Sequence, residues 1–138
     1  PLADPLRGDI EWHIPEPLNV DAMSRAARLF LGEHDFTSFC RRPKGQLEQP
    51  LVRNILSSRW VPQTQQRIQF EIAANAFCHQ MVRSLTGFCV AVGLGKLEPE
   101  AFEAVIEAKS RAAAPPIAPP HGLTLKHVTY GEPSEQDQ

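Results

Sequence analysis

The sequence predicts an α+β domain in which helices pack on one face of a mainly antiparallel sheet. Three observations predict it: segments with strand-like alternation, segments with apolar residues at helical spacing, and their order along the chain, which is helix, strand, strand, helix, helix, strand. The 138 residues are enough for one sizeable core. We expect a single domain over residues 1–131 and a disordered acidic tail over residues 132–138.

The first elements are a loop and a helix. Residues 1–18 are rich in proline, which restricts the residue before it, so a loop or an edge strand is expected. Asn19 suits the N-cap of a helix that Gly32 ends. The apolar residues of this helix recur at helical spacing: Val20, Met23, Ala27, Phe30 and Leu31. Residues 33–46 mix aromatic and charged side chains and close on a turn signal, which predicts an ordered loop.

Two strands are predicted next. The first, Leu51–Val61, is loosely patterned, whereas Ile68, Phe70 and Ile72 alternate cleanly with polar residues in the second. Such alternation is typical of a strand with one buried and one wet face. We therefore expect these two strands to form an antiparallel pair.

From Phe77 to Val92 the apolar period becomes that of a helix. The face opposite its main apolar stripe is also fairly apolar, so we expect this helix to be covered on two sides. Glycines end it, and Pro99 suits the first turn of a third helix, whose trailing charges are Lys109 and Arg111. A proline-rich connector, residues 112–122, then leads to a last strand.

The net charge of −2 hides an uneven distribution. Residues 41–67 hold six basic side chains against Glu48 alone, whereas the last residues are acidic. Local charge governs phosphate contacts more than net charge does, so this segment is compatible with nucleic-acid binding. A solvated loop and strand face would have the same composition.

Cysteine and histidine spacing gives no support to a metal centre. Cys40, Cys78 and Cys89 contain no C-x-x-C pair, and we expect reduced, buried thiols. The five histidines lack the spacing of zinc ligands. No apolar stretch approaches the length that spans a bilayer, and we expect a cytoplasmic chain without its own N-terminal portion.

Arg83 is the outstanding candidate for a functional side chain. Ser38 and Cys40 lie near His34 and Asp35 in sequence, but no nucleophile signature surrounds them. Arg83, in contrast, lies in a strongly apolar helix, away from its main stripe. Its guanidinium stays charged and forms a rigid fork that suits a carboxylate or a phosphate. A surface position or a structural ion pair would also explain it.

Four segments together resemble the tRNA pseudouridine synthase A family. They are Leu31–Phe39 (LGEHDFTSF), Asn75–Arg83 (NAFCHQMVR), Val92–Lys96 (VGLGK) and Ala118–Leu123 (APPHGL), in the order and spacing of that family. The similarity runs from about Trp12 to Tyr130. It departs at Gln80, where a histidine is expected, and at Cys78, where a bulkier apolar residue is common.

The resemblance implies an isomerase that converts uridine to pseudouridine on the 3′ side of the tRNA anticodon arm, with no cofactor. Members use an aspartate in an R-T-D-A-G-like block of their N-terminal half, and no aspartate of this chain lies in such a block. The resemblance therefore implies that this chain holds no catalytic residue of its own. We expect it to be the C-terminal half of such an enzyme, inactive in isolation.

The same resemblance assigns roles to individual residues. Arg83 matches the arginine that pairs with the catalytic aspartate, and Leu123 matches an apolar residue against the target base. We expect Arg41, Arg42 and Lys44 to contact RNA phosphates, with Phe36 and Phe39 packing the loop.

The implied partners are tRNA, the N-terminal domain of the same enzyme and, in a homodimer, a second copy. A stand-alone RNA-binding or dimerisation module without activity is the alternative. An unrelated α+β fold with a structural arginine is a third. A preceding R-T-D-A-G block in the gene would favour the enzyme, and a start codon just before Pro1 would favour the module.

Overall fold

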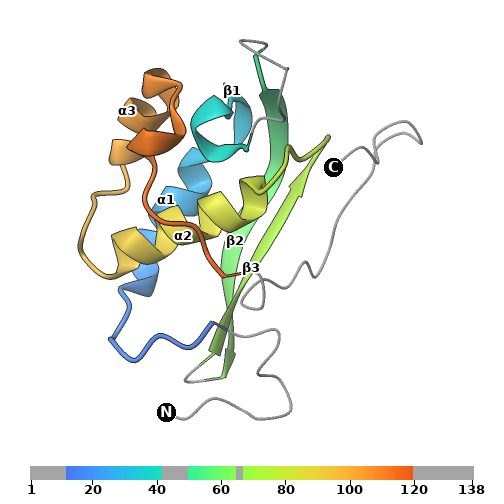
Figure 1. Cartoon of the computed structure of the whole chain (residues 1–138). Coiled ribbons are helices and arrows are strands. Elements are labelled where there is room, and N and C mark those ends of the chain that lie inside the picture. Colours follow the sequence, from blue (N-terminus) through green and yellow to red (C-terminus); the bar gives the residue numbers. More distant parts are fainter. Residues whose placement is uncertain (1–11, 42–49, 65–66, 120–138) are drawn as a thin grey trace.

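The computed structural model describes residues 12–41, 50–64 and 67–119, and the fold is α+β as predicted. Within these residues, three α-helices lie on one side of a three-stranded sheet (Figure 1). The predicted last strand and tail lie outside the described residues. The elements are α1 (Val20–Leu29), β1 (Gly32–Asp35), the 3₁₀ turn η2 (Thr37–Phe39), β2 (Val52–Thr64), β3 (Arg67–Ala74), α2 (Met81–Gly93), α3 (Ala101–Ala108) and the 3₁₀ turn η3 (Arg111–Ala113).

Helix α1 begins after Asn19 as predicted, but it ends at Leu29, so Phe30 is its C-cap and Leu31 lies beyond it, 43% exposed. The side-chain oxygen of Asn19 accepts a hydrogen bond from the backbone N–H of Ala22 at 3.1 Å, which caps the helix. Its buried face consists of Ala22, Met23, Ala26 and Ala27. Gly32 follows with a φ of 93°, a conformation that glycine adopts without steric cost, and the chain turns there into β1.

The sheet has the order β1-β2-β3, and both strand pairs are antiparallel. The predicted pair, β2 and β3, is confirmed, and Trp60 lies opposite Phe70 with the two rings stacked at 4.8 Å. A shift of register between Ile55 and Ser57 leaves Leu56 without a paired residue, and its side chain is 51% exposed. The ladder therefore keeps Ile55 and Phe70 buried toward the helices.

The prediction of a loop over residues 33–46 is wrong for its first residues. Gly32–Asp35 form strand β1, which pairs residue by residue with Val52–Ile55. The four residues of β1 carry no apolar alternation, so the strand depends on its partner β2 and not on its own pattern. The later part of the expected loop contains η2, and residues 42–49 lie outside the described residues.

Helix α2 begins at Met81 and not at Phe77, which corrects the predicted start. Gln80 has a φ of 65°, a left-handed conformation that an α-helix cannot contain. Phe77 and Cys78 are buried at helical spacing, but they pack from an irregular segment ahead of the helix. Every residue of α2 except Arg83 is buried, as expected for a helix covered on two sides.

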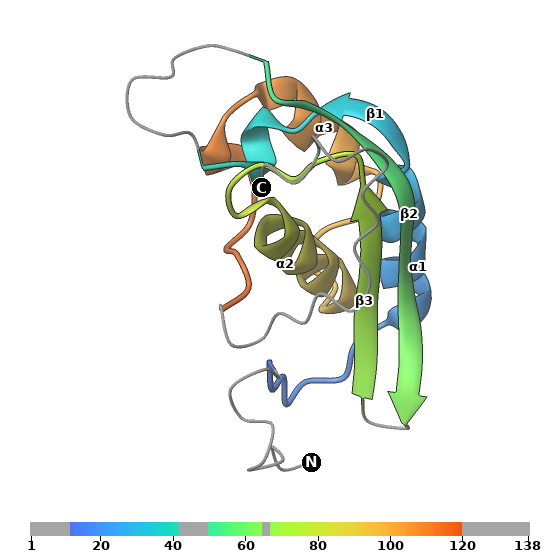
Figure 2. The same ribbon diagram turned by 90° about the vertical axis from the view of Figure 1, so that its right-hand side faces the viewer.

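The second cover of α2 is the part of the proline-rich connector that the structure describes after η3, residues 114–119. Figure 2 shows α2 between β3 and this connector. The approach is closest at Gly87, where an added Cβ would overlap the carbonyl oxygen of Pro116. Only glycine leaves room for such contact between a helix and a neighbouring backbone.

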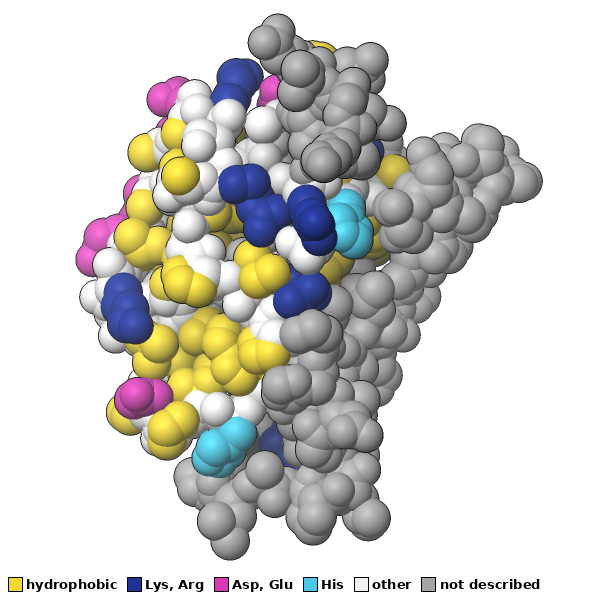
Figure 3. All heavy atoms as spheres, in the orientation of Figure 1, with side chains coloured by type: hydrophobic (Ala, Val, Ile, Leu, Met, Phe, Trp, Pro, Cys, Tyr) yellow, Lys and Arg dark blue, Asp and Glu magenta, His cyan; other side chains and the backbone are white. Residues whose placement is uncertain are grey.

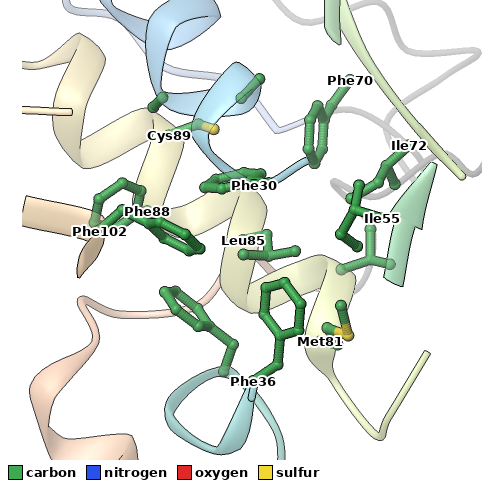
Figure 4. Packing of buried hydrophobic residues seen from close by; sticks show 14 of the residues in the cluster. Phe30, Phe36, Ile55, Phe70, Ile72, Met81, Leu85, Phe88, Cys89 and Phe102 are labelled. Atoms are coloured by element: carbon green, nitrogen blue, oxygen red, sulfur yellow. The ribbon is translucent and has the colours of Figure 1, made fainter. Parts of the chain in front are cut away.

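An aromatic cluster joins the helices to η2 (Figure 4). The ring of Phe102, from α3, lies 5.0 Å from Phe30 and 5.7 Å from Phe39. Phe36 and Phe88 complete the cluster, and none of the five side chains is exposed by more than 1%. The expectation that Phe36 and Phe39 pack the loop is therefore confirmed.

The expectation of three reduced cysteines is wrong for two of them. Cys40 and Cys78 form a disulfide, with 5.6 Å between their Cα atoms, and Cys89 is a free, buried thiol. Sequence spacing missed this pair because its members are 38 residues apart. Their chain segments meet where the N–H of Arg41 donates a hydrogen bond to the carbonyl of His79 at 2.8 Å.

We predict that Gly87→Ala destabilises the fold by about 1–3 kcal/mol, because the new methyl group must displace the connector. Urea unfolding monitored by circular dichroism measures the change. Alanine is the better helix former by about 1 kcal/mol, so helix propensity acts in the opposite direction. An unchanged or increased stability would therefore show that the connector does not lie against α2 in solution.

Candidate functional site

Arg83 lies in the first turn of α2, half-buried beneath the connector. Its Nε donates a hydrogen bond to the carbonyl oxygen of Ala118 at 2.9 Å, and its own carbonyl accepts one from the N–H of Ala118 at 3.1 Å. These two bonds fix Arg83 to the connector, and no hydrogen bond within the described residues uses its terminal nitrogens, Nη1 and Nη2.

No carboxylate within the described residues pairs with Arg83. The ion pairs found there join Arg25 to Glu100, Arg59 to Glu71 and Lys109 to Asp35. Within the described residues, the charge of Arg83 is therefore held in place by neutral groups.

Two further arginines surround this position. Arg41 follows Cys40, and the Nη2 of Arg111, in η3, donates a hydrogen bond to the side-chain oxygen of Gln80 at 3.3 Å. Burial lowers the pKa of Arg111, and the positive charges of Arg41 and Arg83 lower it further. Figure 3 shows several Lys and Arg side chains gathered on the face over the start of α2.

Sequence reasoning found two members of this cluster and missed the third. Arg111 was expected to be a trailing charge of the third helix, but Lys109, with a φ of 49°, ends α3 and the chain turns into η3. The sequence offered one signal for Arg111, namely that it is a second basic residue, after Lys109, beyond the end of the third helix. Arg42, Lys44 and Leu123, the other predicted site residues, lie outside the described residues.

The residues around Asp35 have structural roles. The carboxylate of Asp35 accepts hydrogen bonds from the N–H and hydroxyl of Thr37 and from the N–H of Leu51. The hydroxyl of Ser38 donates to the carbonyl of Val105 at 2.6 Å and accepts from the N–H of Ser110 at 2.9 Å. Both side chains are thus engaged in hydrogen bonds that hold neighbouring segments together.

Among the residues that the structure describes, Cys89 and the metal-binding residue types form no second site. Burial raises the pKa of the Cys89 thiol to about 12, so it is protonated and unreactive at neutral pH. In the described part of the chain, no three His, Cys, Asp or Glu side chains gather as metal ligands would. The helices described there are too short or too polar to cross a bilayer.

Comparison with known proteins identifies the family. The model of the tRNA pseudouridine synthase family matches residues 26–131. The chain is 40% identical over 129 residues to tRNA pseudouridine synthase A of Leifsonia xyli, an alignment that covers 94% of this chain and 44% of the relative. The corresponding protein of Frankia casuarinae is 42% identical over 130 residues, with 93% and 46% covered.

A third relative, tRNA pseudouridine synthase A of Methylacidiphilum infernorum, is 37% identical over 137 residues, with 99% of this chain and 52% of the relative covered. The chain belongs to the tRNA pseudouridine synthase family. It spans about half the length of the curated relatives it matches.

We predict that Asp35→Asn lowers stability at neutral pH by about 1–2 kcal/mol, because a charged acceptor of three local hydrogen bonds is lost. Burial alone would raise the pKa of Asp35, but the hydrogen bonds from Thr37, Leu51 and Lys109 outweigh it and the pKa is lowered. The stabilisation is therefore present above the unfolded-state pKa of about 3.9 and is lost as the pH falls through the folded-state pKa.

Urea unfolding between pH 7 and pH 3 measures both effects. The unsubstituted chain should lose more stability on acidification than Asp35→Asn does. Glu107→Gln, a change on the exposed side of α3, should lose as much stability between pH 7 and pH 3 as the unsubstituted chain does. Parallel pH profiles for the Asp35 variant and the unsubstituted chain would contradict the assignment.

Proposed function

We propose that this chain is the C-terminal half of a tRNA pseudouridine synthase that isomerises uridine to pseudouridine in the anticodon arm of tRNA. The observation that supports this most directly is Arg83, the one residue of α2 that is not buried. It lies in a sequence block that resembles the family, and its terminal nitrogens have no hydrogen-bond partner among the described residues. The catalytic aspartate would come from the N-terminal half.

Arg83 would act on that aspartate by position and charge. A guanidinium beside a carboxylate lowers the carboxylate pKa, which keeps it ionised and ready to react. Since Nε already donates to Ala118, the two terminal nitrogens of Arg83 would donate to the two carboxylate oxygens. The two bonds between Arg83 and Ala118 would hold this geometry before RNA arrives.

The RNA contacts would come from the basic segment that begins at Arg41. We propose phosphate contacts by Arg41, Arg42 and Lys44, and contact of Leu123 with the target base. Of these four, the described residues include Arg41, whose exposed side chain lies next to the start of α2. Backbone contacts of this kind recognise RNA shape and weaken with salt.

The protein partners would be the N-terminal domain and a second copy. Val52 and Leu56 of β2 and Leu31 beside β1 are large apolar side chains that remain exposed, which supports a surface that another domain covers. The proposed domain over residues 1–131 ends where the family match ends. A tRNA substrate implies a cytoplasmic enzyme.

We predict that the chain alone releases no tritium from 5-tritiated uridine in an anticodon-arm RNA, and that adding the N-terminal half restores release. Arg83→Gln should lower the restored rate by roughly 100-fold or more, because the aspartate loses its orienting partner. Arg83→Lys should recover little, since an ammonium cannot replace the fork.

Arg28→Gln, an exposed change at the far end of α1, is the matched control and should leave the rate unchanged. Activity from the isolated chain would refute the proposal. So would full activity of the Arg83→Gln protein.

We predict that the double change Arg41→Ala and Arg42→Ala, in a protein that carries both halves, weakens tRNA binding and flattens its salt dependence. Removal of two phosphate contacts should reduce the slope of log affinity against log salt by roughly 1.4–1.8. Filter binding at several salt concentrations measures it. An unchanged slope would remove these residues from the RNA interface.

A further inference from the structure

The start of α2 carries more positive charge than one catalytic carboxylate can balance. Arg83 lies in its first turn, and Arg41 and Arg111 lie beside it. The first turn contains no acidic residue, and Gln80 makes no side-chain cap. Cations at a helix N-terminus are opposed by the macrodipole, so this arrangement costs stability.

Two of the three guanidinium groups are restrained by neutral acceptors. Arg83 binds the carbonyl of Ala118, and Arg111 binds the side chain of Gln80. Within the described ranges, no carboxylate pairs with any of the three. Each guanidinium has five N–H donors, so most of the donors of Arg83 and Arg111 remain for a ligand.

The backbone around the cluster is fixed from three sides. The N–H of Arg41 is bonded to His79, and Cys40 is joined to Cys78. Ser110, immediately before Arg111, is bonded through its N–H to the hydroxyl of Ser38. Gln80 has a left-handed backbone conformation, and its side-chain oxygen accepts the hydrogen bond from Arg111. A site held this way needs little ordering when a ligand binds.

We propose that Arg111, positioned by Gln80, joins Arg41 and Arg83 in one anion site that receives a backbone phosphodiester of the RNA next to the target uridine. The inference rests on the proposed function. One carboxylate would leave a charge of two on the cluster, and a phosphodiester takes up one of them. Planar guanidinium forks match its two free oxygens.

The anion site itself is tested by titrating the full chain with inorganic phosphate and following the Nε–H signals of its arginines by NMR. The signals of Arg83 and Arg111 should shift together in the unsubstituted chain, and the shift should be lost in Arg111→Gln. Gln80→Glu, which supplies an internal carboxylate without removing a packed side chain, should abolish the shift as well. Absence of any shift in the unsubstituted chain overturns the proposal.

The phosphodiester is tested with fluorescent anticodon-arm hairpins that carry one neutral methylphosphonate on either side of the target uridine. Arg111→Gln should weaken binding of the natural hairpin roughly tenfold, whereas Arg28→Gln should not. At one of the two linkages, the methylphosphonate hairpin and the Arg111→Gln chain combined should lose no more binding affinity than either change causes alone.

Additive losses at both linkages would mean that the site takes a different anion. Equal hairpin affinity of the Arg111→Gln and unsubstituted chains would also overturn the inference. Either result would leave the proposed function standing, because tritium release with the N-terminal half depends on Arg83. Conversely, absence of tritium release together with the expected hairpin binding would contradict the proposed function and leave the anion site standing.

Discussion

The close approach of the connector to Gly87 is the constraint on which the rest of the site depends. It allows residues 114–119 to cover the side of α2 that faces away from the sheet, so a helix in the middle of the domain is shielded on both sides. The same approach places Ala118 where it can bind Arg83 through two hydrogen bonds. The packing of the connector and the hydrogen bonding of Arg83 are therefore linked, because Gly87 lets the connector backbone come close enough to bind Arg83.

Much of the fold could be predicted because its signals are local. The Asn19 cap and the alternation around Phe70 depend on neighbours in sequence, and both appear in the structure. Strand β1 could not be predicted from its own residues, since its pairing with β2 supplies the order. The start of α2 was misplaced because Phe77 and Cys78 are buried at helical spacing by tertiary contacts.

The candidate site was predictable only in part, for a similar reason. Arg83 is conspicuous because a charge stands in an apolar helix, a property visible in sequence. The position of Arg111 depends on the turn at Lys109 and on the conformation of Gln80, neither of which has a sequence signature. The pairing of Cys40 with Cys78 is likewise set by the meeting of η2 with the segment before α2.

The bond between Cys40 and Cys78 encloses β2 and β3 in a covalent loop. In the chain-entropy account, closing a loop of this size restricts the unfolded chain by an amount worth about 3–4 kcal/mol. Arg41 directly follows one end of the loop and His79 the other, so the backbone of Arg41 is tied to the segment before α2. The oxidation state of two sulfur atoms thereby helps to determine where Arg41 lies relative to the start of α2.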